Sequence, residues 1–208
     1  MMVTESNLAS SLILSRRSLL AGSLASAAML AVPGRAIAQV DTGRLRAIAQ
    51  RELDRHKGWI WLRDRVGIVD FTLPSRDPRL FIVDMVGGMI DPFYTTHGRG
   101  SDPEHDGWLK SFSNVPESNA SSRGAYATGS YYEGRHGLSM RLKGLESDNV
   151  TAEDRAIVVH GAWYANPDVI PTQGKLGRSE GCFALPEDKL AQVIAKLGHG
   201  RLLFADRL

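Results

Sequence analysis

The one cysteine of this chain, Cys182, ends a segment of small turn-forming residues, Ser179-Glu180-Gly181-Cys182. A histidine, His160, lies 22 positions before the cysteine. It follows a run of apolar residues and precedes Gly161. A thiol attacks carbon only as its thiolate, and a neighbouring imidazole makes thiolate available near neutral pH. The two residues therefore predict a thiol acyl-transfer site, with Cys182 as the nucleophile and His160 as the base.

The residues around the thiol suit this chemistry better than a structural role. Free cysteine is commonly buried in protein cores, but Gly177, Ser179 and Gly181 are turn formers. Gly181 lets the backbone approach a substrate closely, and we expect the amides of Gly181 and Cys182 to meet the developing oxyanion. Ser179 can hydrogen-bond within the turn or to the substrate. Pairing with imidazolium should lower the pKa of the thiol.

The base must also be held in place. Ala156 to Val159 are all apolar, so a buried strand should deliver His160 at its end. The imidazole needs a hydrogen-bond acceptor on its second ring nitrogen to fix its tautomer and angle. No aspartate or asparagine is obviously placed for this task, so a backbone carbonyl near Gly161 is the expected acceptor.

The elements that position these residues are mostly strands. A helix is expected over 41–57, with Thr42 as its cap, and another over 186–197, with Pro186 at its first position and Gly198 at its end. Apolar runs predict strands over 66–71, 79–84, 90–97, 126–132, 138–142, 156–159 and 201–205. The pattern indicates a mainly β (α+β) domain with a helix near each end. Residues 98–124 form a long loop, which is usually functional or mobile.

The first residues are typical of an export signal. Arg16 and Arg17 form a twin-arginine pair before a weakly apolar stretch, and Ala36-Ile37-Ala38 fits a cleavage site. We expect a signal peptide over 1–38, an N-terminal helix over 39–58 and a catalytic domain over 59–208. The mature protein would then work in the periplasm without a membrane span. An uncleaved membrane anchor is the alternative.

Composition narrows the possible partners. The 208-residue chain has a formal charge of +2, but residues 1–38 hold three arginines and one glutamate, so the remaining 170 residues carry 22 basic and 22 acidic side chains. Without a surplus of positive charge, no nucleic-acid partner is expected. A single cysteine forms no internal disulfide. The mature length suits one domain with a sizeable core.

Five segments in order carry a resemblance to a known family. The chain resembles the YkuD-type L,D-transpeptidases, in particular the murein L,D-transpeptidase catalytic-domain branch, over residues 60–206. The matching segments are Val69–Ser75, Thr96–Ser101, Phe112–Asn114, His136–Leu142 and Gly177–Cys182. The Ser-x-Gly-Cys motif alone would be a weak signal, whereas the ordered set is specific.

The resemblance implies a β-sandwich or barrel-like domain with a few flanking helices, whose cysteine and histidine face a cleft. Such enzymes act on peptidoglycan stem peptides and need no cofactor. The thiolate attacks a carbonyl on an L-configured centre of a donor stem, D-Ala leaves, and an amine of an acceptor stem resolves the thioacyl-enzyme. The product is a 3-3 crosslink, or an L-Ala–diaminopimelate 1-3 crosslink in branches of the family that cleave another stem bond. A monomer is expected.

The resemblance leaves a second reaction open. If water replaces the acceptor amine, the same thioacyl route makes the enzyme a carboxypeptidase or endopeptidase that hydrolyses stems or releases wall-attached protein. One departure also concerns substrate binding, because many relatives carry arginine two positions after the cysteine, where this chain has Ala184. Arg178, Arg123 or Arg99 would then hold a substrate carboxylate, since a guanidinium binds it in bidentate fashion.

Other side chains could line the cleft. His97, His136 and Tyr164 are candidate substrate contacts, with ordinary structural roles equally open for the histidines and packing favoured for the tyrosine. A zinc hydrolase is disfavoured because no His-Glu-x-x-His or His-x-His spacing occurs, so no metal ligand is assigned. A wall-binding module without enzymatic activity is the remaining rival, and it would tolerate loss of Cys182.

Overall fold

The computed structural model describes residues 41–208, so the predicted signal peptide lies outside the described residues. In chain order the elements are α1 (Thr42–Arg55), β1 (Arg65–Asp70), β2 (Leu80–Asp84), β3 (Ile90–Phe93), η1 (Arg99–Ser101), β4 (Gly124–Gly134), β5 (Gly137–Gly144), β6 (Val158–Gly161), η2 (Trp163–Ala165), η3 (Pro167–Val169), α2 (Ile170–Gln173), β7 (Phe183–Leu185), α3 (Glu187–Leu197) and β8 (Leu202–Asp206). Within 41–208, none of the helices has the length and apolar character needed to cross a membrane.

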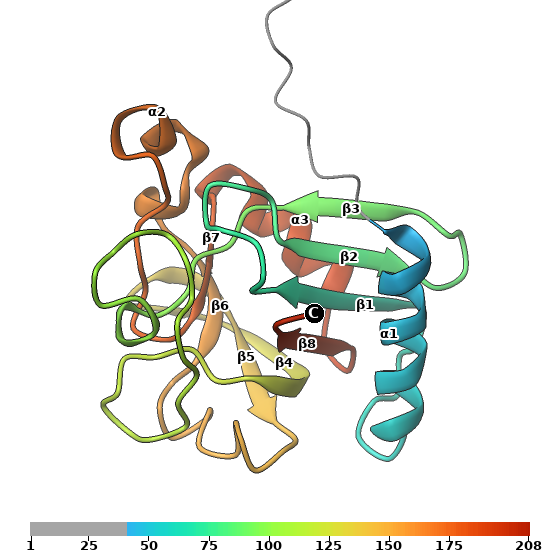
Figure 1. Ribbon diagram of the computed structural model, residues 1–208. Helices are drawn as coiled ribbons and strands as arrows, with labels where there is room; N and C mark the ends of the chain where they lie inside the picture. The colour runs from blue at the N-terminus through green and yellow to red at the C-terminus, as the bar shows by residue number, and fades with distance from the viewer. Residues whose placement is uncertain (1–40) are drawn as a thin grey trace, which may run out of the picture. The chain divides into compact units, whose positions relative to one another are not determined.

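The strands form one mixed sheet of eight in the order β3-β2-β1-β8-β4-β5-β6-β7 (Figure 1). The β1–β8 and β6–β7 pairs are parallel, and all other neighbours are antiparallel. The predicted mainly β fold with flanking helices is confirmed. Only β7 has no counterpart among the predicted strands, because its three residues are too few to show a periodic pattern.

Side-chain alternation along the central strands builds a core on each face of the sheet. In β1, Val66 and Ile68 pack in the cluster that contains α1, whereas Val69 packs in the cluster that contains α3. In β2, Phe81 and Ile82 divide in the same way. Burying each such side chain contributes about 1.5–3 kcal/mol, so both helices are held by the sheet.

In both main helices the N-cap lies one residue away from its predicted position. The side chain of Asp41, not Thr42, caps α1 by accepting from the backbone N of Arg44 at 2.9 Å. Helix α3 begins at Glu187, with Pro186 as its N-cap.

The strand predicted over 90–97 ends earlier, at Phe93. The residues that follow leave the sheet edge and bond to the segment around the cysteine. Thr96 N donates to Ala184 O at 3.0 Å, and His97 O accepts from Ser179 N at 2.9 Å. Competition from these partners overrides the local strand preference, and it ties this segment to the candidate nucleophile.

The long loop over 98–124 is closed by hydrogen bonds between its two ends. Gly98 N donates to Ser121 Oγ and Ser121 N donates to Ser101 Oγ, both at 2.9 Å. Gly100 N donates to Asn119 O, also at 2.9 Å. The loop therefore holds a defined shape, which brings η1 and the chain near Ala120 against the cysteine turn.

Candidate active site

The parallel pairing of β6 with β7 places the cysteine beside the histidine. Val159 lies opposite Phe183 and His160 lies opposite Ala184, so Cys182 reaches the sheet at the level of the residue before Val159. Val159, Phe183 and Ala184 are fully buried. A slip of one residue would turn these side chains to the other face, so their burial fixes the register and with it the relative position of thiol and imidazole.

One cavity of about 550 Å³ opens onto both groups. Its walls come from η1, the β4–β5 hairpin, β6 and the segment that leads into β7. Seven of the residues proposed from the sequence line it, namely Cys182, His160, Ser179, Arg178, Arg99, His136 and Tyr164. Gly161 and Gly181 adjoin lining residues through the backbone, whereas His97 and Arg123 are not among the residues that line the cavity.

The turn before the cysteine is held by its own serine. Ser179 Oγ donates to Cys182 O at 2.7 Å and accepts from Gly181 N at 3.2 Å. Gly181 has φ +116°, and a Cβ there would lie 2.7 Å from Ala120 O, so only glycine fits. Of the two contacts expected of Ser179, the structure shows the one within the turn. The Gly181 amide, expected to face an oxyanion, donates to this hydroxyl instead.

His160 is oriented by the backbone, as expected. Its Nδ1 lies 2.9 Å from Gly161 O, so Nδ1–H donates to this carbonyl and Nε2 keeps a free lone pair. The His136 ring stacks on it, with ring centroids 4.4 Å apart and planes 25° apart. Burial lowers the pKa of His160, and the neighbouring His136 and Arg135 lower it further, while the hydrogen bond to Gly161 opposes the shift. The imidazole is therefore neutral at pH 7 and able to accept a proton.

The expected depression of the thiol pKa is wrong for this resting geometry. Burial raises the pKa of Cys182, and the negative charge of Glu180 adds to the rise. A backbone hydrogen bond from Val158 and the charges of Arg155 and Arg135 offset part of it. The Sγ atom lies 3.5 Å from Ala156 O, where a thiol, but not a thiolate, donates a hydrogen bond. The resting pair is thus thiol and neutral imidazole.

The three arginines proposed for carboxylate binding have different surroundings. Arg178 lines the cavity but donates to the carbonyls of Asp102 and Pro103. Arg99 lines it and pairs with Glu180 at 3.1 Å. Arg123 lies away from the thiol and pairs with Asp206 at 3.0 Å and Asp148 at 3.7 Å, so the structure does not bring it to the candidate site.

Arg155 is a cavity residue that sequence reasoning missed. Its Nη1 donates to Ser113 O at 2.8 Å and to Ser122 Oγ at 2.7 Å, and its Nη2 donates to Ala120 O at 2.5 Å. Burial lowers its pKa, and the charges of Tyr126 and Cys182 oppose that shift. Arg155 precedes β6 by only a few residues, so its proximity in sequence to His160 was the available signal.

Tyr164 also borders the thiol, and packs against the backbone of the turn. Burial raises the pKa of Tyr164 to about 12, and the negative charges of Cys182 and Glu180 add to the shift. A Cβ on Gly177 would lie 2.6 Å from Tyr164 Cβ, so the tyrosine fixes the start of the cysteine turn. Trp163 and Trp108 are 65% and 40% exposed and do not line the cavity, so neither serves as a cavity wall.

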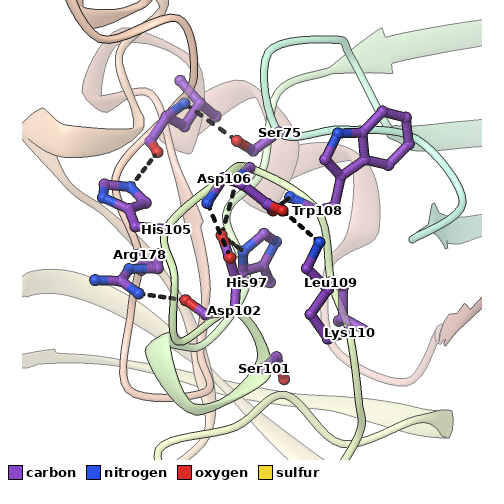
Figure 2. Close-up of polar contacts among 12 residues, drawn as sticks. Ser75, His97, Ser101, Asp102, His105, Asp106, Trp108, Leu109, Lys110 and Arg178 are labelled. Carbon is purple, nitrogen blue, oxygen red and sulfur yellow. Dashed lines mark hydrogen bonds and ion pairs between the residues drawn. The ribbon is translucent and has the colours of Figure 1, made fainter.

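His97 belongs to a buried polar network, and Figure 2 shows its contact with Asp102. Nδ1 accepts from Arg79 Nη2 at 2.9 Å, so Nε2–H donates to Asp102 Oδ2 at 3.1 Å. Asp102 also accepts from the backbone N of Asp106 and of Gly107, both at 3.0 Å. Burial and the charge of Arg79 lower the pKa of His97, and Asp102 opposes them. His97 thus stays neutral, and its backbone O holds the cysteine turn by accepting from Ser179 N.

This network predicts acid sensitivity of the fold. His97 is neutral when folded but has a pKa near 6.5 when unfolded, so the unfolded chain binds a proton first as pH falls. Protonation of His97 therefore leaves the free energy of unfolding unchanged above about pH 7.5 and lowers it by about 2 kcal/mol at pH 5. Urea unfolding at both pH values should show this loss in the parent and in His199→Asn, a surface control, but not in His97→Asn. An equal pH slope in all three proteins would contradict the network.

The thiol environment predicts slow alkylation at neutral pH. Because burial and Glu180 raise the pKa of Cys182, the midpoint of the alkylation rate against pH should lie above the ordinary value of about 8.5. Glu180→Gln removes one cause and should move the midpoint down, whereas Asp188→Asn on α3 should leave it unchanged. Iodoacetamide kinetics from pH 6 to 10 measure both. A midpoint near pH 7 in the parent would contradict this and support a thiolate–imidazolium pair instead.

Comparison with known proteins finds solved structures that this chain is similar to. Similar solved structures include L,D-transpeptidases from Mycobacterium smegmatis, 13% identical with a TM-score of 0.41, and from Mycobacterium tuberculosis H37Rv, 14% identical with a TM-score of 0.44. Each match covers 69% of this chain and 58% or 57% of the other, so the chain spans less than two thirds of those proteins. No curated protein gives a significant match.

A family model supplies the decisive match. The model for the L,D-transpeptidase catalytic domain matches residues 45–205, a span that runs from α1 to β8 and includes both Cys182 and His160. The resemblance inferred from five sequence segments is therefore confirmed at the level of the family. The chain belongs to the YkuD-type L,D-transpeptidase catalytic domain family, a family of enzymes.

Proposed function

We propose that this protein is a cysteine-dependent L,D-transpeptidase that joins peptidoglycan stem peptides through a thioacyl-enzyme on Cys182. The observation that carries the proposal is the opening of Cys182 and His160 onto one cavity. A base on β6 and a nucleophile directly before the neighbouring parallel strand β7, with room for a peptide beside them, are the parts that acyl transfer needs. Twin arginines at residues 16 and 17 support export, so the proposed place of action is the periplasm.

The first half-reaction begins with a neutral pair. As Sγ attacks the carbonyl carbon of the donor stem, His160 Nε2 takes the thiol proton, since Nδ1–H is committed to Gly161 O. Collapse of the tetrahedral intermediate breaks the bond to the terminal D-Ala, and His160 returns the proton to the leaving amine. A base whose pKa lies below its ordinary value is ready to accept at pH 7 and gives the proton back easily.

The second half-reaction reverses these proton transfers. An amine of an acceptor stem approaches the thioester, loses a proton to His160 Nε2, and forms the new amide bond. The thiolate leaves and recovers its proton from the imidazolium, which restores the neutral pair. Water in place of the amine gives hydrolysis, so the balance between crosslinking and cleavage depends on which acceptor reaches the cavity.

Four arginines make the cavity suitable for the carboxylates of stem peptides. Arg155 is the best candidate for a fixed contact, because three oxygen acceptors hold its guanidinium beside the thiol. Those bonds use three of its five N–H groups and leave two for a ligand. Arg155 would therefore replace the arginine that many relatives carry at the position of Ala184. Arg99, Arg135 and Arg178 complete the positive rim.

The proposed reaction is tested by the products it makes. The purified protein and a Cys182→Ala control are incubated with tripeptide, tetrapeptide and pentapeptide muropeptides, and products are analysed by mass spectrometry. We expect dimers in the parent only. Loss of the terminal D-Ala marks a 3-3 bond, whereas a 1-3 bond requires release of the donor stem beyond L-Ala, and fragmentation distinguishes the two. Shortened monomers alone would make the enzyme a peptidase. Unchanged stems in every sample would overturn the assignment of this substrate.

The role proposed for Arg155 predicts a contrast between two cavity arginines. Arg155→Lys keeps the charge but loses the planar fork, so kcat/KM for the donor stem should fall about 10- to 100-fold, or about 1.4–2.7 kcal/mol. Arg135→Lys is the matched control, because that side chain is 80% exposed and its ion pair with Glu180 is long, at 4.0 Å. Its kcat/KM should change less than about threefold. Equal losses in the two variants would contradict a special role for Arg155.

A further inference from the structure

A second cluster of metal-ligating side chains lies outside the cavity that holds Cys182. Glu52 lies in the last turn of α1, His56 is the C-cap residue of that helix, and Glu146 belongs to the turn that follows β5. Each offers one ligand atom, and these atoms all lie within 4.8 Å of one another. The spacing on α1 places the first two side chains on one face of the helix. Glu146 is distant from both in sequence, and folding brings it near them.

Glu52 carries an unsatisfied buried oxygen. The residue is 1% exposed, and its Oε1 accepts from Arg51 Nε at 2.8 Å, but its Oε2 has no hydrogen-bond partner. The nearest basic nitrogens to Oε2 are His56 Nδ1 at 3.7 Å and Arg55 Nη1 at 3.9 Å. A buried carboxylate oxygen without a partner is costly, so it points to a ligand.

The tautomer of His56 adds an independent sign. Nδ1 lies 3.0 Å from the backbone O of Glu52, so Nδ1–H donates to that carbonyl and leaves a lone pair on Nε2. Nε2 lies 3.2 Å from Glu146 Oε1, which itself has no hydrogen-bond partner. Two acceptors that face each other this closely need a cation or a proton between them. A carbonyl on Nδ1 is also the support that metal-bound histidines usually have.

We propose that Glu52, His56 and Glu146 bind a divalent cation of the zinc class. Imidazole with two carboxylates suits Zn²⁺, which binds nitrogen and oxygen at about 2.0–2.2 Å. Ligand atoms of a tetrahedral site then lie about 3.3 Å apart, close to the present separation of His56 and Glu146. Rotation of the Glu52 carboxylate brings in the third ligand. The sequence showed no metal motif because Glu146 is 90 positions away from His56.

The surroundings leave access for the ion and for a water as fourth ligand. His56 and Glu146 line a cavity of about 570 Å³, and Asp148 and Asp206 add carboxylates to its wall. Arg55 and Arg123 also line it and oppose a cation. However, the Arg55 side chain is 63% exposed and lies 3.7 Å from Glu146 Oε1, so it can turn away, and Arg123 pairs with Asp148 and Asp206.

The site would act on the fold and not on the reaction. The cation would tie α1 to the turn after β5, and Asn149 of that turn donates to Ala125 O of β4 at 2.8 Å. Binding therefore links the N-terminal helix to the sheet by bonds that a folded chain alone supplies. The inference stands apart from the proposed transpeptidase function, because none of its ligands lines the cavity that holds Cys182.

Zinc binding to the protein is the direct test. The Cys182→Ala protein, which removes thiolate as a rival ligand, is titrated with ZnCl₂ by calorimetry at pH 7.5, and thermal unfolding is followed with and without the metal. We expect one ion per chain with micromolar or tighter Kd, and a rise in Tm of at least about 5 °C at a hundredfold excess over Kd. Co²⁺ should give the visible absorption of a tetrahedral complex.

Matched variants separate this site from adventitious binding. Glu52→Gln keeps the shape of the side chain and should weaken zinc binding at least 100-fold, while its metal-free Tm stays at or above that of the parent because the orphaned charge is gone. His136→Asn removes an exposed histidine of the other cavity and should leave Kd unchanged. If Glu52→Gln fails to fold, Glu146→Gln provides the same test from the other side.

A proton on His56 is the competing occupant. It would form an imidazolium–carboxylate pair with Glu146, and no metal would be needed. Absence of stoichiometric zinc binding at pH 7.5, or equal Kd values in the parent and both glutamine variants, would overturn the proposal in favour of that ion pair or of adventitious surface binding. Loss of peptidase and transpeptidase activity alone bears only on the proposed function.

Discussion

The parallel contact between β6 and β7 is the constraint on which the candidate site depends. These strands contribute only four and three residues, yet their register decides whether thiol and imidazole meet. Apolar burial of Val159 and Phe183 sets that register, and the cysteine turn is tied down from outside the sheet by the bond from Ser179 N to His97 O. The site is therefore built by long-range contacts that lock two short strands.

The same contacts explain the protonation of the pair. A turn that packs tightly enough to fix Cys182 also removes water from it, so burial raises the thiol pKa and lowers that of His160. Opposite shifts favour the neutral forms of both groups, and proton transfer then accompanies attack rather than preceding it. A cysteine that stays protonated until a substrate arrives is less open to unwanted thiol reactions.

The sequence was most informative where chemistry and local pattern coincide. Cys182, His160 and the carbonyl that orients the imidazole follow from neighbouring residue types, and the regular strands follow from apolar runs. Arg155 lies close to His160 in sequence, but its partners Ser113, Ala120 and Ser122 do not, so its place in the cavity could not be predicted. The contact of His97 with Arg79 and the meeting of Glu52 with Glu146 also join segments that are separate in sequence. The end of the strand at Phe93 was missed for the same reason, since bonds to the cysteine segment replace the sheet ladder.

The four arginines that line the cavity are of two physical kinds, and the difference affects how the cavity would bind a negatively charged peptide. Arg155 and Arg178 are held by backbone carbonyls, so they present charge without reorganisation, which is the condition for strong electrostatic stabilisation near a reacting centre. Arg99 and Arg135 are exposed and share Glu180, so water screens them and they act mainly in attracting anions. Both held arginines bond to the loop over 98–124, but only Arg155 bonds to Ala120 O, the atom that a Cβ on Gly181 would meet. Arg155 is therefore the arginine tied most directly to the cysteine turn.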